Sequence, residues 1–358
     1  MKRRDFIQTL AIAGSTTAVF APSMLSCQPT KEKLGIALVG LGYYSTDVLA
    51  PAFQYTKKCY LAGIVTGTPA KAEQWKKKYN IAEKNIYNYE NFDKIANNSD
   101  IDVVYVVLPP SMHREFVIRA AKAGKHVFCE KPMAPTVADC EAMIKACQDN
   151  KVKLAIGYRC QHDPNTQAYM KLGREKILGK VQMISCAAGY FDGRSSHWKQ
   201  QKAMGGGAMY DMGVYALQGA RLATGEEPIA VTAQHFTTRP DIYKEVDETT
   251  LFQLQFPSGA VASCQTSFGI NMNYLQVNCE KGWIKLEPFS AYNGNKGSSS
   301  QGVINFPIEN QQAKQMDEDA EAIMQNKPLL VPGEEGLRDI KVVEAIYEAA
   351  RTGKQIKL

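Results

Sequence analysis

The stretch LGIALVGLGYYS, residues 34–45, decides the fold of the first half of the chain. Its apolar run from Leu34 to Val39 predicts a buried strand, and a glycine turn follows directly. The turn reads Gly-x-Gly-x-x-Ser, one residue short of the dinucleotide fingerprint, in which glycines let the backbone approach a pyrophosphate at a helix N-terminus. Ser45, in the third place, is small enough for close packing of a helix expected over residues 46–55.

Strands and helices continue to alternate as far as residue 157. Further buried strands are expected over residues 60–65, 102–108, 127–129 and 154–157, with helices between them at 112–123 and 138–149. This order predicts a parallel sheet with right-handed crossovers. After residue 157 the pattern changes to strands that alternate apolar and polar residues, which is typical of an antiparallel sheet with one open face.

The predicted fold class is therefore α/β plus α+β: a Rossmann parallel sheet followed by a large, mostly antiparallel open sheet. We expect a dinucleotide-binding Rossmann domain over residues 34–157 and a substrate-binding and oligomerisation domain over 158–358. The C-terminal helix, expected over 337–351, can pack back on the first domain. The outer face of the second sheet is expected to pair with another subunit, giving a dimer or tetramer.

Residues 1–30 read as a targeting segment. Arg3-Arg4-Asp5-Phe6-Ile7 resembles the twin-arginine signal, whose export machinery would then be a partner. Met24-Leu25-Ser26-Cys27 resembles a lipobox, which would attach the membrane lipid to Cys27; the alternative is an ordinary signal-peptide end with an incidental cysteine. Either reading predicts a bacterial protein that is periplasmic, or lipid-anchored facing the periplasm or the cell exterior.

Charge and metal-ligating residues exclude some classes of partner. The net charge is +6, and its one basic run, Lys76-Lys77-Lys78, reads as a solvated helix face rather than a nucleic-acid patch, so we expect no nucleic acid. The nine cysteines show no C-x-x-C spacing, and the five histidines show no paired ligand spacing. We expect no metal.

The loop after the second strand bears on the choice of cofactor. NAD-binding proteins usually place an acidic residue there against the ribose 2′-hydroxyl, whereas this chain has Thr66-Gly67-Thr68. Lys71, three residues on, would suit a 2′-phosphate, although it can equally be a surface lysine. NADP(H) is therefore favoured, and NAD(H) stays possible.

Two further segments can carry chemistry. Glu130-Lys131-Pro132 ends a strand at the sheet edge where ligands bind, so Lys131 can meet a substrate oxygen; the alternative is a surface ion pair. Asp211 and Tyr215, four residues apart after a run of three glycines, would share one face of a helix as an acid–base pair. The alternative there is a pair that only hydrogen-bonds within the core.

Together these motifs resemble the Gfo/Idh/MocA oxidoreductases over residues 34–358, and most closely their glucose–fructose oxidoreductase branch. Residues 157–160, 163–165, 225–229 and 345–353 carry the likeness to that branch, which also has Tyr at position 215. The resemblance implies a catalytic set of Lys131, Asp211 and Tyr215, and substrate-binding residues Lys131, Arg159, Trp198, Asp211 and Tyr215. It implies cofactor contacts from Gly40, Gly42, Tyr43, Tyr44, Thr66, Gly67, Lys71, Leu108, Pro109, His113, Glu130, Lys131 and Arg159.

The resemblance also implies a role for each position. Lys131 would bridge the nicotinamide ribose and the reacting substrate oxygen, and Tyr215 would act as acid–base, with a pKa lowered by Lys131. Asp211 would orient the sugar or the lysine, and Arg159 would hold a substrate hydroxyl or the nicotinamide end of the cofactor. His113 can instead cap a helix, and Trp198 can instead be a packing residue.

The predicted function is that of an exported oxidoreductase, which transfers a hydride between a tightly bound NADP(H) and a sugar or polyol. One alternative is an NAD-dependent glycosidase of the same superfamily. Another is a non-catalytic sugar-binding relative, which would not need the acid–base set.

Overall fold

The structure is a computed structural model that describes residues 31–358. The expectations for the twin-arginine segment and Cys27 fall on residues 1–30, which lie outside the described part. They stay predictions.

The first domain is built on a parallel sheet with the order β3-β2-β1-β4-β5-β6. This order reverses between β1 and β4, and ligands of such sheets bind at that switch point, beyond the carboxyl ends of the strands. The fold class expected for this half is confirmed. The strands are β1 (Leu34–Val39), β2 (Cys59–Val65), β3 (Ile86–Tyr87), β4 (Val103–Val106), β5 (His126–Cys129) and β6 (Leu154–Ile156).

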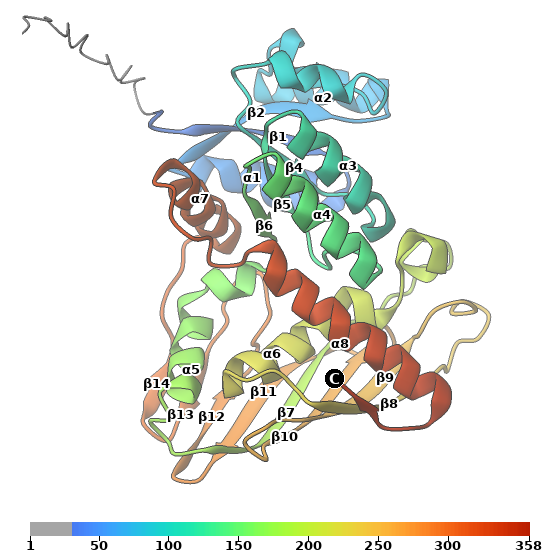
Figure 1. The fold of residues 1–358 in the computed structure, drawn as a ribbon, viewed down its shortest axis with the longest axis vertical. Helices are drawn as coiled ribbons and strands as arrows, with labels where there is room; N and C mark the ends of the chain where they lie inside the picture. Colours follow the sequence, from blue (N-terminus) through green and yellow to red (C-terminus); the bar gives the residue numbers. More distant parts are fainter. Residues whose placement is uncertain (1–30) are drawn as a thin grey trace, which may run out of the picture. The chain divides into compact units, whose positions relative to one another are not determined.

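Helices cover both faces of this sheet (Figure 1). α3 (Pro110–Lys122) and α4 (Val137–Asp149) pack on one face, and α7 (Gln311–Met324) returns from the second half of the chain to the other. α2 (Pro69–Tyr79) follows β2. The helix expected over 46–55 begins earlier and is irregular: a π-helix η1 (Tyr44–Leu49), a short α1 (Ala50–Ala52) and a 3₁₀ turn η2 (Phe53–Tyr55).

The second half forms a sheet with the order β14-β13-β12-β11-β7-β10-β9-β8-β15. Within the described residues, β7 and β10 are its one parallel pair, so it is mostly antiparallel as expected. Three short strands, β13 to β15, lack the length for a readable alternation and were not expected. The bounds are β7 (Val181–Gly189), β8 (Ala230–Phe236), β9 (Thr249–Gln255), β10 (Val261–Ser267), β11 (Met272–Cys279), β12 (Gly282–Leu286), β13 (Gly297–Ser299), β14 (Gly302–Ile304) and β15 (Ile356–Lys357).

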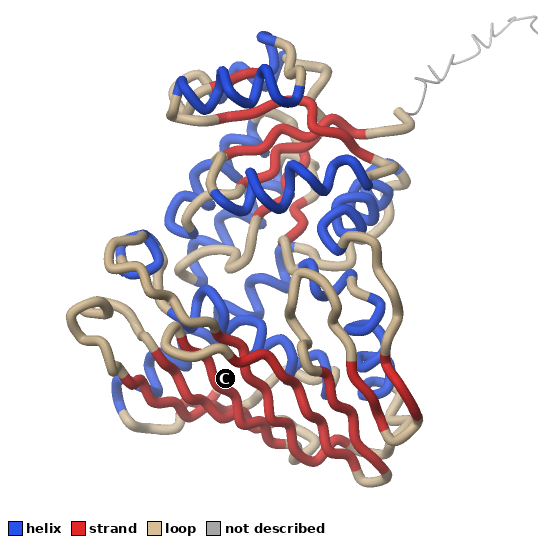
Figure 2. Tube along the Cα trace, turned by 180° about the vertical axis from the view of Figure 1, so that it is seen from behind, coloured by secondary structure: helices blue, strands red, loops and turns tan. Residues whose placement is uncertain are grey.

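In the described part of the chain, helices cover one face of this second sheet and leave the other open (Figure 2). α6 (Val214–Thr224) packs on its centre, α5 (Pro164–Arg174) packs on α6, and α8 (Gly333–Thr352) packs on β8. α8 also contacts α4 of the first domain, where the Val137 amide donates to Glu344 Oε1 at 2.8 Å. Figure 2 shows the opposite, open face of the strands. In the described part of the chain, no helix combines the length and apolar character needed to span a membrane.

Candidate active site

The glycine turn after β1 is closed against the loop that follows β4. Gly40 has a φ of +90°, and a Cβ there would lie 2.4 Å from the Val107 carbonyl oxygen and 2.7 Å from Leu108 Cδ2. The hydroxyl of Ser45 donates to the Gly40 oxygen at 2.5 Å, which explains a serine in the third fingerprint place. A Cβ on Gly42 would meet no atom within 4 Å. The turn therefore leaves open space where a pyrophosphate would approach the backbone.

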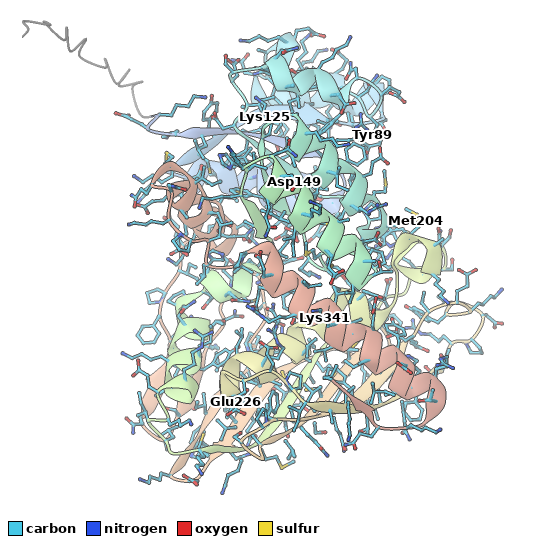
Figure 3. All side chains as sticks on the ribbon, viewed as in Figure 1. Tyr89, Lys125, Asp149, Met204, Glu226 and Lys341 are labelled. Atoms are coloured by element: carbon cyan, nitrogen blue, oxygen red, sulfur yellow. The ribbon has the colours of Figure 1, made fainter. Side chains whose placement is uncertain are left out.

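A cavity of about 250 Å³ adjoins this turn. The amine of Lys71 reaches into the same region and donates to the Leu41 oxygen at 3.0 Å. At the end of β2, Gly67 lies under the ring of Tyr89, labelled in Figure 3, from which a Cβ would be 3.1 Å away. These residues fit a dinucleotide, with the Lys71 cation beside the turn and no carboxylate in the Thr66-Gly67-Thr68 loop that follows β2. The cavity is lined by Leu41, Gly42, Tyr43, Thr46, Asp47, Lys71, Gln74 and Trp75.

Lys131 stands at the carboxyl end of β5, on the same sheet edge as the glycine turn. The Glu130 amide donates to the Val106 oxygen at 3.0 Å, so strand pairing continues as far as the residue before it. The Lys131 ammonium donates to the backbone oxygen of Asp211 at 2.6 Å and to Asp211 Oδ1 at 3.3 Å. The same nitrogen lies 4.8 Å from the ring centroid of Tyr215. The structure thus brings together the three residues expected to be catalytic.

The helix that carries Asp211 begins in a π-helical turn, η8 (Met209–Gly213), which continues into α6. Gly207, with a φ of +115°, leads into it, and a Cβ there would lie 2.3 Å from Asp247 Oδ1. Asp247 holds the helix start by accepting the Met209 amide at 2.8 Å. The spacing of four residues predicted a regular α-helix at this point, whereas the structure has a π-turn, a feature that is frequent at functional sites.

Asp211 has two partners that the sequence analysis missed. Its Oδ2 accepts from the ammonium of Lys199 at 2.6 Å and from the hydroxyl of Tyr190 at 3.3 Å. Burial acts to raise the pKa of Asp211, but Lys199, and after it Lys131, hold that pKa well below its usual range through charge and hydrogen bonds. Asp211 is therefore a carboxylate at neutral pH.

Tyr215 is buried between two cations. Its ring centroid lies 4.8 Å from Lys131 Nζ and 5.5 Å from the guanidinium carbon of Arg159. Burial raises the pKa of the phenol; Arg159 opposes the rise, and neighbouring acidic groups add to it. The expectation of a lowered pKa is wrong, because the effect of burial on the phenol outweighs that of the cations around it. Tyr215 is a neutral phenol at neutral pH.

Arg159 is directed at the protein's own acceptors. Its Nη1 donates to the Ala291 oxygen at 2.8 Å and its Nη2 to the Ser290 oxygen at 2.7 Å, while Nη1 also contacts the amide oxygen of Gln311. Its guanidinium carbon lies 4.5 Å from the ring centroid of Tyr292. Both terminal nitrogens are thus bonded to protein acceptors that hold the loop carrying Tyr292, whereas the buried Nε has no hydrogen-bond partner among the described residues. The direct contact of Arg159 with substrate or cofactor stays a prediction.

Glu130 and His113 are buried next to the strand end that carries Lys131. Glu130 accepts from the hydroxyl of Tyr105 at 2.6 Å, and burial raises its pKa from 4.5 to about 7. His113 Nε2 lies 2.8 Å from the Leu108 oxygen, and its Nδ1 lies 3.1 Å from the oxygens of Pro132 and Met133. At 1% exposure, His113 links two loops of the sheet edge rather than facing a ligand or capping a helix.

The remaining predicted residues lie in the loop after β4, in the glycine turn after β1 and in the segment before Gly205. Leu108 and Pro109 follow β4, with Leu108 against Gly40 and Pro109 preceding α3. Tyr44 places its ring 5.9 Å from that of Tyr292, so the nucleotide turn meets the second domain, while Tyr43 is 67% exposed at the cavity. Trp198 is half-buried in a short turn, η6 (Trp198–Gln200), with Lys199 Nζ 5.8 Å from its ring.

Two further observations concern the cysteines and the possible metal ligands of the described residues. Eight cysteines of residues 31–358 are free and buried, including Cys160 beside Arg159. In the same residues, no three His, Cys, Asp or Glu side chains gather in a way that could hold a metal ion.

Comparisons with known proteins concern the family and the fold of the chain. Residues 34–158 match the model of an oxidoreductase family with an NAD-binding Rossmann fold, and residues 166–285 match the GFO/IDH/MocA C-terminal domain. The structure of an aldose-aldose oxidoreductase from Caulobacter crescentus, complexed with glycerol, is 44% identical, with a TM-score of 0.87 over 91% of this chain and 100% of that chain. The D-xylose 1-dehydrogenase [NADP(+)] of Haloarcula marismortui is 26% identical, over 92% of this chain and 94% of that protein. The inositol 2-dehydrogenase of Rhizobium meliloti is 28% identical, over 70% and 74%.

Proposed function

The chain belongs to the Gfo/Idh/MocA oxidoreductases, and from this premise we propose that it transfers a hydride between a tightly bound NADP(H) and a sugar or polyol. The observation that carries the proposal is the meeting of Lys131 with Asp211 and Tyr215. Lys131 comes from the edge of the nucleotide-binding sheet, and the other two come from the second domain. Reacting groups of a cofactor and a substrate would meet at such a junction.

Each of the three residues has its own role in proton transfer or in stabilising charge. Bound NADP(H) would supply or accept the hydride. The Lys131 ammonium binds the substrate oxygen and stabilises the charge that develops there. Tyr215 donates its phenolic proton to that oxygen in the reducing direction and takes it back in the oxidising direction. Asp211 fixes the ammonium through its backbone oxygen.

The preference for NADP(H) over NAD(H) is supported by the end of β2. Thr66, Gly67 and Thr68 offer no carboxylate for a ribose 2′-hydroxyl, and the Lys71 amine stands beside the glycine turn. The relative from Haloarcula marismortui is a D-xylose 1-dehydrogenase named for NADP(+). We propose that Lys71 pairs with the 2′-phosphate.

A sugar or polyol as substrate is supported by the relatives and by the side chains near Lys131. The relatives are named for aldoses, xylose and inositol. Trp198 offers a half-exposed ring for stacking on a sugar face, close to Lys199 and Asp211. The side chains of Lys131 and Asp211 are each 12% exposed, so both can still reach a ligand.

Export and assembly complete the proposal. We propose that the twin-arginine machinery carries the folded protein, with its cofactor already bound, to the periplasm or to a lipid anchor at Cys27. Two substrates used in turn would then recycle the cofactor where no soluble nicotinamide pool is expected.

We also propose that the open sheet face pairs with a second copy. Trp283, Met183 and Val261 lie in one row across it, with Asn278 between the first two, and are 40%, 46% and 43% exposed. Three large apolar side chains exposed on one sheet face support a subunit interface there.

Mass spectrometry of the denatured full-length protein tests the tightly bound cofactor. We expect about one NADP(H) per chain from the purified wild type. Gly40→Ala is the matched control, because its Cβ would clash with the Val107 oxygen at 2.4 Å, and it should release none. A wild type that releases no nicotinamide nucleotide and binds none when it is added would refute the proposal.

A further inference from the structure

The carboxylate of Asp211 is shared unequally between two ammonium groups. Lys199 Nζ lies 2.6 Å from Oδ2, whereas Lys131 Nζ lies 3.3 Å from Oδ1. Lys199 also donates to the hydroxyl of Tyr190 at 3.0 Å, and that hydroxyl lies 3.3 Å from the same Oδ2. Lys199, and not Lys131, is therefore the main counter-ion of Asp211.

Lys131 contacts Asp211 mainly through the main chain. Its shortest hydrogen bond, at 2.6 Å, goes to the Asp211 backbone oxygen, which carries no net charge. If Lys199 were removed, Lys131 would be the ammonium left to balance the Asp211 carboxylate in this partly buried site. Its charge would then be drawn toward Asp211 and away from a substrate oxygen.

We propose that Lys199 is a positioning residue, which neutralises the Asp211 carboxylate and so leaves the positive charge of Lys131 available to the reacting substrate oxygen. This inference rests on the proposed oxidoreductase function and deepens it. Lys199 is well placed for the task, because its ammonium lies 5.3 Å from the ring centroid of Tyr190 and 5.8 Å from that of Trp198. Its side chain is 20% exposed, and its hydrogen bonds to Asp211 and Tyr190 hold the ammonium in place.

A double-mutant cycle separates this role from direct binding of substrate. Lys199→Met should lower kcat for hydride transfer by roughly 100-fold, with the KM for sugar changed by less than about threefold. In an Asp211→Asn background the same substitution should cost less than about twofold, because no carboxylate is left to neutralise. Lys199→Arg should recover most of the rate. Lys202→Met, an exposed lysine of the next turn, is the control and should leave the rate unchanged.

Two outcomes of the cycle would overturn the inference. Equal losses in both backgrounds would mean that Lys199 acts on the substrate itself. An unchanged rate in Lys199→Met would mean that Asp211 needs no second cation.

A second measurement needs no substrate and so does not depend on the proposed function. Carbon-13 NMR of labelled aspartate, with Asp211→Asn assigning the signal, reports the pKa of Asp211 directly. In Lys199→Met this pKa should rise by about one unit or more, because the nearest opposite charge is gone while Lys131 and Arg194 remain. An unchanged pKa would overturn the inference. If the wild type turns over no sugar, the proposed function fails, while this titration still decides the role of Lys199.

Discussion

The ammonium of Lys131 and the backbone oxygen of Asp211 lie 2.6 Å apart, although 80 positions separate the two residues in the sequence. The contact joins the carboxyl edge of the parallel sheet to the π-helical turn that precedes α6. Neither domain can form this site alone. The chemistry therefore depends on both domains being folded and packed together.

Lys131→Met tests the cation of the site. Removing the ammonium should slow hydride transfer by roughly 100- to 1,000-fold, because one preorganised charge at the reacting oxygen is lost. Single-turnover fluorescence of the nicotinamide measures that rate, and NADPH titration should show binding changed by less than about threefold. Lys122→Met, at the exposed end of α3, is the matched control. Full turnover in Lys131→Met would contradict the assignment.

The raised pKa of Tyr215 predicts opposite pH dependences for the two directions of reaction. Sugar oxidation needs the phenolate, so its rate should rise with pH through the neutral range toward the raised pKa. Reduction uses the neutral phenol and should stay level over the same range. Rapid-mixing kinetics in each direction provides the profiles. Tyr215→Phe should abolish the rise, and a rise that persists in this variant would assign the proton step to another group.

Lys71→Ala tests the choice between the two nicotinamide cofactors. Loss of a charged partner for the 2′-phosphate should weaken NADPH binding by about tenfold or more and leave NADH binding unchanged. Fluorescence titration of each reduced cofactor measures both constants. Lys77→Ala, on the same helix, is the control. Equal weakening for both cofactors would show that Lys71 does not read the 2′-phosphate.

Glu130→Gln tests the buried carboxyl behind the site. The pKa of Glu130 is raised from 4.5 to about 7 by burial, so the unfolded chain loses this proton at a lower pH than the folded chain. Stability from this group is fully present below pH 4.5 and is lost as the pH rises to about 7, by about 3 kcal/mol in all.

Urea unfolding at several pH values measures the difference between wild type and Glu130→Gln. Because glutamine does not ionise, the wild type should lose stability relative to the variant between pH 4.5 and about 7. Asp319 and Asp339, whose pKa values are also raised, contribute equally to both proteins and cancel in the difference. Stability curves that run parallel would contradict the buried-acid interpretation.

Much of the fold, and the part of the site that lies in the first domain, could be predicted from local sequence patterns. The apolar strand before Gly40 and the glycine turn are contiguous, and the Glu130-Lys131-Pro132 strand end lies in one short run. Such features need no knowledge of tertiary contacts. The spacing of Asp211 and Tyr215 also predicted that the two side chains lie on one face of a helix. In the structure both contact Lys131.

The missed residues Lys199 and Tyr292 come from segments without periodicity, whereas Tyr190 directly follows β7. Lys199 and Tyr190 lie on either side of a loop, and Tyr292 lies in a loop after β12, so only the packed structure brings them to the site. The one available signal was a cation, Lys199, beside an aromatic residue just before the glycine-rich segment. The direction of the Tyr215 pKa was beyond the sequence too, because it depends on how deeply the phenol is buried.

Deuterium transfer tests the central claim most directly. The full-length protein is incubated with NADP⁺ and a panel of carbon-deuterated aldoses and polyols, and the nicotinamide is then analysed by mass spectrometry. A hydride-transferring sugar oxidoreductase predicts deuterium on the nicotinamide ring with at least one member of the panel, and its loss in Lys131→Met. Sugar turnover without any deuterium on the nicotinamide, or no turnover with any member of the panel, would contradict the account.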